Sequence, residues 1–161
     1  MGIVTGISGP GGGLTEAQVD ARVALYAPTS GTFTPVIQDA DLSDAEGQTY
    51  SIQNGWYRVI NDLVFFGIDV EITSLGTLST GAAVRLAGLP FTCNSDNHAI
   101  VSSTALSLSI TAGVTVTGHV QNTTDHIRVK KWSATTGTSD LTIAELSAGA
   151  RLILTGTYIK A

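Results

Sequence analysis

The sequence contains a single cysteine, Cys93, and few charged residues. One cysteine excludes an intrachain disulfide and a cysteine metal cage. Charged residues make up 13% of the 161 positions, whereas about 25% is usual for a soluble domain. An isolated globule with so few solvated groups has difficulty covering its surface. We therefore expect extensive burial between subunits, or a β-rich surface covered with threonine and serine.

The chain also lacks a basic cluster and a long apolar run. Its 13 acidic and 8 basic residues give a formal net charge of −5. This balance argues against a nucleic-acid partner, because neutralising phosphates requires clustered cations. No apolar run approaches the roughly 20 residues that cross a bilayer, so we expect no membrane insertion. The first residues lack the basic segment of a secretion signal, and we expect synthesis in the cytoplasm.

The length and composition fit one folded domain with an N-terminal extension. Hydrophobic residues make up 43% of the chain, which is enough apolar surface to offset the loss of chain entropy and excludes intrinsic disorder. Residues 1–13 end in a run of glycines around Pro10. Such a composition predicts a flexible joint.

One helix is expected, over about Glu16 to Ala27 in the segment 14–28. Thr15 and Gln18 form a capping-box pair at its start, and Pro28 ends it. Its apolar positions form one narrow seam: Val19, Val23 and Tyr26. A helix of about 12 residues is marginal in water on its own, so the seam must pack on something. It either docks on its own domain or, as we favour, forms a short parallel bundle with copies of itself.

From Gly31 onward the apolar pattern alternates, which is typical of an all-β fold. Asn54-Gly55 and Asn61-Asp62 predict two tight turns. With both turns, one face of the segment 49–72 is apolar and predicts the core: Tyr50, Ile52, Tyr57, Val59, Val64, Phe66, Ile68, Val70 and Ile72. The opposite face is mixed and suits a subunit interface or a ligand platform: Gln53, Trp56, Arg58, Phe65, Asp69 and Glu71, with Gly67 across from Trp56.

Further short strands are expected around 82–86, 98–103, 106–110, 114–121, 126–132 and 151–159. Many short antiparallel strands in one domain favour a β-sandwich of the jelly-roll kind. We therefore expect residues 29–161 to form an antiparallel β-sandwich head after the short helix.

The segment Val114–Trp132 predicts a hairpin with a polar face. A turn at Asn122–Asp125 pairs Thr117 with Lys130 and His119 with Arg128. The polar face then combines hydrogen-bond donors, cations and an indole: Thr115, Thr117, His119, Gln121, His126, Arg128, Lys130 and Trp132. This combination suits a sugar, because its CH face stacks on tryptophan while its hydroxyls take hydrogen bonds. An ordinary solvated hairpin face is the alternative.

Two groups of residues are therefore candidate ligand contacts. The first choice is Arg128, Lys130 and Trp132, supported by His119 and Gln121. The second choice is Trp56 and Arg58.

The sequence supports a metal site or a catalytic site less well than a glycan-binding face. His98, His119 and His126 lack a third ligand at a recognised spacing, although a threefold axis would supply one from each subunit. Asp69 and Glu71 are spaced as a solvated stripe on a strand rather than as a glycosidase pair. We expect no metal, no cofactor and no enzymatic activity.

Four stretches resemble the C-terminal modules of bacteriophage tail-fibre and receptor-binding proteins. They are Gly31–Pro35, Gln53–Phe66, Gly88–Phe91 and the closing strand Leu152–Ile159. The resemblance covers residues 31–161 and implies a homotrimeric β-sandwich that binds a bacterial surface glycan or protein without cleaving it. Because the chain has no long shaft, it implies a small spike or head fibre of a phage or a phage-like gene transfer particle.

In that setting, residues 1–13 are expected to anchor the chain to a larger virion protein, on the tail or the capsid surface. Two other functions stay open. One is a structural decoration protein that binds no receptor, and the other is an enzyme that degrades polysaccharide.

Overall fold

The computed structural model describes residues 13–25, 27–39, 46–96 and 99–161. These residues form one α-helix, a ten-stranded antiparallel sheet and one short 3-10 helix. In chain order the elements are α1 (Glu16–Leu25), β1 (Thr29–Phe33), β2 (Val36–Gln38), β3 (Thr49–Ile60), β4 (Leu63–Ser74), β5 (Arg85–Ala87), β6 (Ala99–Leu106), β7 (Thr115–Val120), β8 (Ile127–Ser133), β9 (Gly137–Asp140), η1 (Ile143–Glu145) and β10 (Arg151–Ile159).

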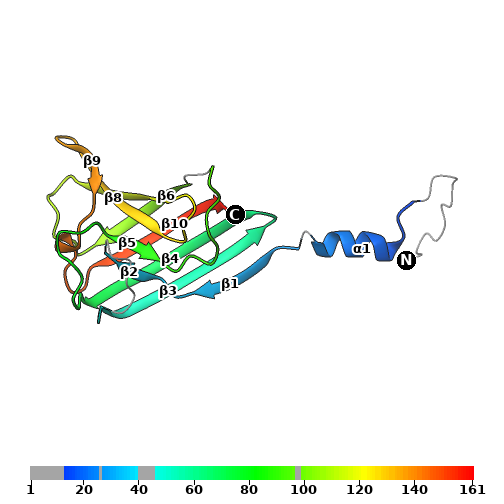
Figure 1. Cartoon of the computed structure of the whole chain (residues 1–161), viewed down its shortest axis with the longest axis horizontal. Helices are drawn as coiled ribbons and strands as arrows, with labels where there is room; N and C mark the ends of the chain where they lie inside the picture. Colours follow the sequence, from blue (N-terminus) through cyan, green and yellow to red (C-terminus); the bar gives the residue numbers. More distant parts are fainter. Residues whose placement is uncertain (1–12, 26, 40–45, 97–98) are drawn as a thin grey trace, which may run out of the picture.

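The sheet curls around a single core. Its strand order is β1-β3-β4-β10-β6-β7-β8-β5-β2, and β9 pairs with β8 outside this path. Because β1 and β2 are consecutive in the chain yet lie at opposite ends of this order, the linker between them brings the two ends of the sheet together. The expected all-β, antiparallel, sandwich-like fold is confirmed, and a single curled sheet provides both of its layers (Figure 1).

Side chains close the sheet where its two ends meet. One edge of β2 pairs with β5, and the other edge faces polar side chains from the β3 region. Tyr50 Oη accepts a 2.9 Å hydrogen bond from the amide of Ile37, and Gln48 Nε2 donates to the Ile37 carbonyl at 3.1 Å. Gln53 Nε2 donates to the Pro35 carbonyl at 2.9 Å. These bonds satisfy backbone groups that an open sheet edge would leave unpaired.

The core lies on the inner face of the curled sheet, as the alternating pattern of β4 predicts. The β4 residues expected to face inward are all buried: Val64, Phe66, Ile68, Val70 and Ile72. They pack with buried residues of neighbouring strands, such as Leu154 of β10 and Val129 of β8. Tyr57 and Val59 of β3 also face this core, as expected. Burial of this alternating face is what commits the segment to strands.

The turn expected at Asn54-Gly55 is wrong, whereas the turn at Asn61-Asp62 is confirmed. β3 runs straight through Gly55 and pairs there with Phe33 of the neighbouring β1. A Cβ atom at this position would lie 2.7 Å from the Phe33 ring, so only glycine fits. The glycine therefore makes room for an aromatic ring rather than for a turn. Without the turn, Gln53 lies opposite the buried Val70 and reaches Pro35, so its expected place on the outward face is also wrong.

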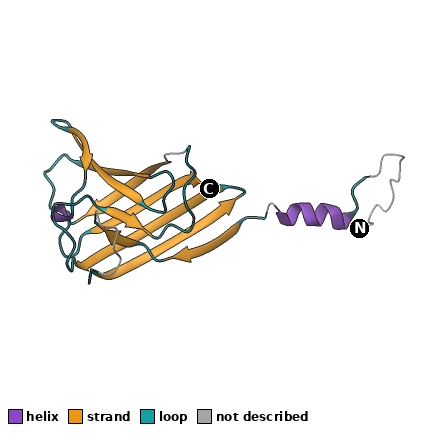
Figure 2. Cartoon of the chain, viewed as in Figure 1, coloured by secondary structure: helices purple, strands orange, loops and turns teal. Residues whose placement is uncertain are grey.

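The helix α1 stands clear of the sheet (Figure 2). The capping box is confirmed, since Thr15 N donates to Gln18 Oε1 at 2.9 Å and Gln18 N donates to Thr15 Oγ1 at 3.3 Å. Val19 is 43% exposed and Val23 is 65% exposed. Docking of the seam on its own domain, the first of the two alternatives, is therefore contradicted. Tyr26 and residues 1–12 lie outside the described residues.

None of the helices in the described ranges has the length and apolar character that a bilayer-spanning helix requires.

Candidate functional site

The hairpin of β7 and β8 has the register that the sequence predicts. Thr117 pairs with Lys130, His119 with Arg128, and Thr115 with Trp132. The side chains of His119, Arg128, Lys130 and Trp132 therefore share the outer face of the sheet, while Ile127 and Val129 are buried in the core. The arrangement of the first-choice ligand residues is thus as expected.

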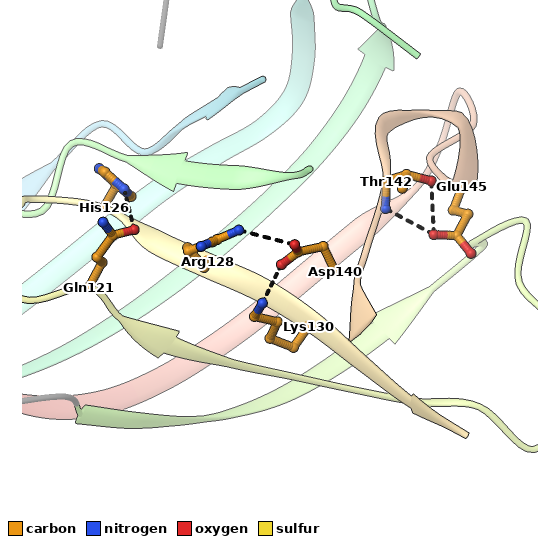
Figure 3. A network of polar contacts seen from close by, with 7 residues as sticks. All are labelled: Gln121, His126, Arg128, Lys130, Asp140, Thr142 and Glu145. Atoms are coloured by element: carbon orange, nitrogen blue, oxygen red, sulfur yellow. Dashed lines mark hydrogen bonds and ion pairs between the residues drawn. The ribbon is translucent and has the colours of Figure 1, made fainter. Parts of the chain in front are cut away.

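A third strand, β9, changes the charge of this face. Asp140 Oδ2 lies 3.0 Å from Arg128 Nη2, and Asp140 Oδ1 lies 2.5 Å from Lys130 Nζ (Figure 3). Burial raises the pKa of the Asp140 carboxyl, but the hydrogen bond from Lys130 and the charge of Arg128 outweigh it and hold this pKa below its usual value. The Asp140 carboxylate therefore forms ion pairs with both Arg128 and Lys130.

The sequence interpretation missed Asp140 because it assigned no strand to residues 137–140. The available signal was Gly137, which follows a polar run and adopts a positive φ of 71°. A glycine of this kind is typical of a tight hairpin that folds the next residues back along β8. Such a hairpin places Asp140 beside Lys130.

Gln121 and His126 form a structural pair at the other end of the hairpin. The His126 ring nitrogen Nε2 lies 3.2 Å from Gln121 Oε1 (Figure 3). His126 is 6% exposed rather than solvated. Its burial first, and then the nearby Arg85, hold the pKa of His126 below its usual value, so the ring is neutral near pH 7. The hydrogen bond between the His126 ring and the Gln121 side chain therefore holds Gln121 in place.

The second-choice residues lie elsewhere on the sheet. Four strands separate β3 from β8, so Trp56 and Arg58 lie roughly 24 Å along the sheet from Arg128, at about 4.8 Å per strand. Trp56 is 53% exposed and its indole covers Gly67, the residue expected opposite it. Trp56 also lines a cavity of about 510 Å³, together with residues from the end of β1 and from the middle of β3. The two choices are therefore separate surfaces.

Trp56 belongs to a broader apolar surface, which we call the outer apolar face. It consists of seven exposed large apolar residues on the outward sides of β3, β4, β10 and β6: Trp56, Ile60, Leu63, Ile100, Leu106, Ile153 and Ile159. Polar side chains interrupt this face, since Ile153 lies opposite Asp69 of β4 and Thr104 of β6.

A second surface lies at the end of the sheet opposite α1, where Figure 1 shows β9 and Figure 2 shows η1. There a cavity of about 450 Å³, which we call the tip cavity, opens between the β6–β7 loop, the β8–β9 hairpin and η1. Five hydroxyl side chains line it: Thr111, Ser133, Thr135, Thr136 and Ser139. Four apolar side chains also line it: Ile110, Ala112, Val114 and Ala134.

Lys131 and Glu145 supply the charged part of the tip cavity. Lys131 lies next to Lys130 in the chain but on the opposite side of β8, and its Nζ pairs with Glu145 Oε1. Glu145 Oε2 accepts hydrogen bonds from the amide of Thr142 at 2.9 Å and from its hydroxyl at 3.0 Å (Figure 3). Burial raises the pKa of Glu145, but Lys131 and Thr142 outweigh it and lower this pKa below its usual value. Glu145 is therefore a fixed carboxylate.

The carboxylates considered for catalysis are engaged in structural contacts. Arg151 donates to both oxygens of Asp69, at 2.7 and 2.6 Å, and this bidentate pair lowers the pKa of Asp69. Glu71 accepts a 2.8 Å hydrogen bond from Ser51 Oγ. Across the described part of the chain, no cluster of three histidine, cysteine or acidic side chains is arranged to hold a metal ion. His98 lies outside that part.

Comparisons with known proteins place the fold. No family model matches the chain, and no curated protein matches it. Among solved structures, the chain is similar to the crystal structure of the Dettilon tailspike protein, gp208, with 18% sequence identity and a TM-score of 0.66. The match covers 83% of this chain and 24% of that chain, so this chain spans about a quarter of the tailspike. The curled sheet described above is thus a fold that also occurs as a segment of a tailspike protein.

Proposed function

We propose that this chain is the receptor-binding part of a trimeric, tail-associated phage virion protein, which attaches the particle to a glycan on the bacterial surface. The observation that carries this proposal is the match of 83% of the chain to a segment of a tailspike protein. The resemblance of residues 31–161 to receptor-binding modules points to the same function. Anchoring through residues 1–13 to a larger virion protein remains part of the proposal.

The exposed helix supports the trimer. An isolated helix as short as α1 is marginal in water, and the sheet of its own chain does not stabilise it. Val19 and Val23 lie four positions apart and share one helix face, which suits parallel packing of identical helices. The outer apolar face provides a second area that partner copies would cover. Threefold display would then multiply weak contacts with a glycan through effective concentration.

The charge arrangement supports binding without cleavage. Glycoside hydrolysis generally uses two carboxyl groups that flank the scissile bond. Among the described residues that line the tip cavity, Glu145 is the one acidic group, and it is held ionised by Lys131 and Thr142. A general acid must carry a proton at the operating pH, which a carboxyl with a lowered pKa does not.

Mass photometry of the full chain tests the trimer. We expect a particle of three times 16.6 kDa. Replacing Val19 and Val23 together by aspartate places charges in the seam and should shift the population toward monomer at least tenfold. Ala21→Asp, on the opposite side of α1, is the matched control and should leave the trimer intact. A parent chain that is monomeric at micromolar concentration would contradict the assembly.

Attachment to cells tests the receptor-binding role. The fluorescently labelled full chain is incubated with a panel of bacterial strains, before and after periodate oxidation of their surface polysaccharides. We expect binding to some strains and its loss after oxidation. Binding to capsids but to no cells would indicate a decoration protein, and shortened polysaccharide chains after incubation would indicate an enzyme.

A further inference from the structure

We propose that the tip cavity is the glycan site and that it takes a neutral saccharide. This inference rests on the proposed function and locates its site on residues other than Arg128, Lys130 and Trp132. The inference depends on an open, hydroxyl-lined cavity at the end of the molecule away from α1. The charged side chains of this cavity neutralise each other.

The position of the cavity suits a receptor site. If α1 leads to the rest of the particle, the opposite end of the sheet faces the cell. The tip cavity lies at that end, between loops that follow β6 and β8. Binding residues commonly lie on such loops, held by a rigid scaffold. The outer apolar face lies on the outward sides of β3, β4, β10 and β6, and none of its seven residues lines the tip cavity.

The charge of the lining selects against an ionic ligand. The charged side chains that line the cavity within the described chain are Lys131 and Glu145, and they pair with each other. The charge of Lys131 is already offset by Glu145, and this fixed carboxylate repels an anionic sugar, so the lining offers such a ligand no net attraction. A neutral sugar can instead accept from the ammonium and donate to the carboxylate while the pair stays intact.

The remaining lining matches the two sides of a sugar ring. Among the described residues, the hydroxyls of Thr111, Thr135 and Ser139 have no protein hydrogen-bond partner, so they are available to a ligand. Each hydroxyl both donates and accepts, as sugar hydroxyls do. Ile110 and Val114 supply apolar surface for the CH groups. The cavity volume of about 450 Å³ falls within the range of about 300 to 1,000 Å³ that is typical of small-molecule sites.

Internal hydrogen bonds hold the walls in place before a ligand arrives. Ser133 Oγ accepts from the amide of Thr136 at 3.1 Å and lies 3.0 Å from the Thr136 hydroxyl, which fixes the β8–β9 turn. The amide of Ser109 donates to the Glu145 carbonyl at 2.8 Å, which ties the β6–β7 loop to η1. A preformed site loses less conformational entropy on binding and gains affinity.

Adjacent residues of β9 provide a matched test. Ser139 lines the tip cavity, whereas Thr138 lies on the other side of the strand, opposite Trp132. Both are exposed. The full-length parent, Ser139→Tyr and Thr138→Tyr are applied to an array of neutral and acidic bacterial surface glycans at 50 and 500 mM salt. We expect the parent to bind neutral glycans with little salt dependence, Ser139→Tyr to lose at least tenfold, and Thr138→Tyr to stay within about twofold.

A second variant guards against a folding defect. Thr111→Ala combined with Thr135→Ala removes two exposed hydroxyls without adding bulk, and we expect it to weaken binding about tenfold while its thermal unfolding matches the parent. The site proposal is overturned if Ser139→Tyr binds as the parent does, if Thr138→Tyr alone abolishes binding, or if the bound glycans are acidic and released by salt. It is also overturned if no neutral glycan binds.

The same variants separate this inference from the proposed function. If the parent and Ser139→Tyr attach equally well to cells, the receptor role stands and the tip cavity is not its site. If neutral glycans occupy the cavity but the parent attaches to no cells, the site stands and the receptor role fails.

Discussion

The side-chain hydroxyl of Tyr158 donates a 2.9 Å hydrogen bond to the carbonyl of Phe91. The same hydroxyl accepts from the Phe91 amide at 3.3 Å, and Tyr158 is buried in the core. Burial raises the pKa of Tyr158, which keeps its hydroxyl protonated and able to donate. Phe91 in turn packs edge-on against Tyr57, with ring centroids 5.6 Å apart. Three of the stretches that resemble phage receptor-binding modules therefore meet at the core, where Tyr158 and Tyr57 hold the segment after β5 against β10 and β3.

Tyr158→Phe should destabilise the protein by about 1 to 3 kcal/mol, because it leaves the partly buried backbone carbonyl and amide of Phe91 without their partner. Urea unfolding followed by circular dichroism measures this change. Tyr57→Phe is the control, since no hydrogen bond of the Tyr57 hydroxyl is found among the described residues. Equal losses in the two variants would contradict a specific role for the Tyr158 hydroxyl.

Gly67→Ala should displace the Trp56 indole, because the added methyl would occupy the space that the ring now fills. In a Trp132→Phe background, Trp56 is the sole tryptophan, and its emission should move to longer wavelength as the ring becomes more solvated. Since Trp56 is already half exposed, we expect a loss of about 1 kcal/mol rather than more. Gly81→Ala meets no atom within 4 Å and should change neither quantity. Unchanged emission in Gly67→Ala would refute the contact.

Stability should fall at acid pH. Cations and hydrogen bonds hold the pKa values of Asp69, Asp140 and Glu145 below their usual values. A carboxyl with a lower pKa in the folded state stabilises the protein fully above its unfolded pKa, which is about 4. This contribution is lost as pH falls below that value through the folded pKa. We expect the free energy of unfolding to decrease steadily between pH 5 and 2.5.

Asp69→Asn should remove part of this pH dependence, and Arg151→Gln should remove a similar part, because the two side chains form one bidentate pair. Urea titrations at half-unit pH intervals provide the comparison. If either variant keeps the full acid slope of the parent, the Asp69–Arg151 pair does not contribute to it.

Local patterns in the sequence were sufficient for much of the fold. The alternation in β4 identified its buried face, and the turn signal at Asn61-Asp62 located the β3–β4 hairpin. The capping box at Thr15 located the start of α1, and the pairing of β7 with β8 followed from a short turn. Each of these features depends on residues that are close in the chain, so the sequence pattern reports them directly.

The sequence by itself determined which side of each strand is apolar, and hence that His119, Arg128, Lys130 and Trp132 share a face. Only the tertiary structure decided what meets that face. Asp140 neutralises its cations because β9 folds back on β8, and Gly55 continues β3 because Phe33 of β1 packs on it. The tip cavity is assembled from three segments that are separated in the chain. A strand's own pattern records its burial, but its neighbours are chosen by packing between distant residues, which no local pattern encodes.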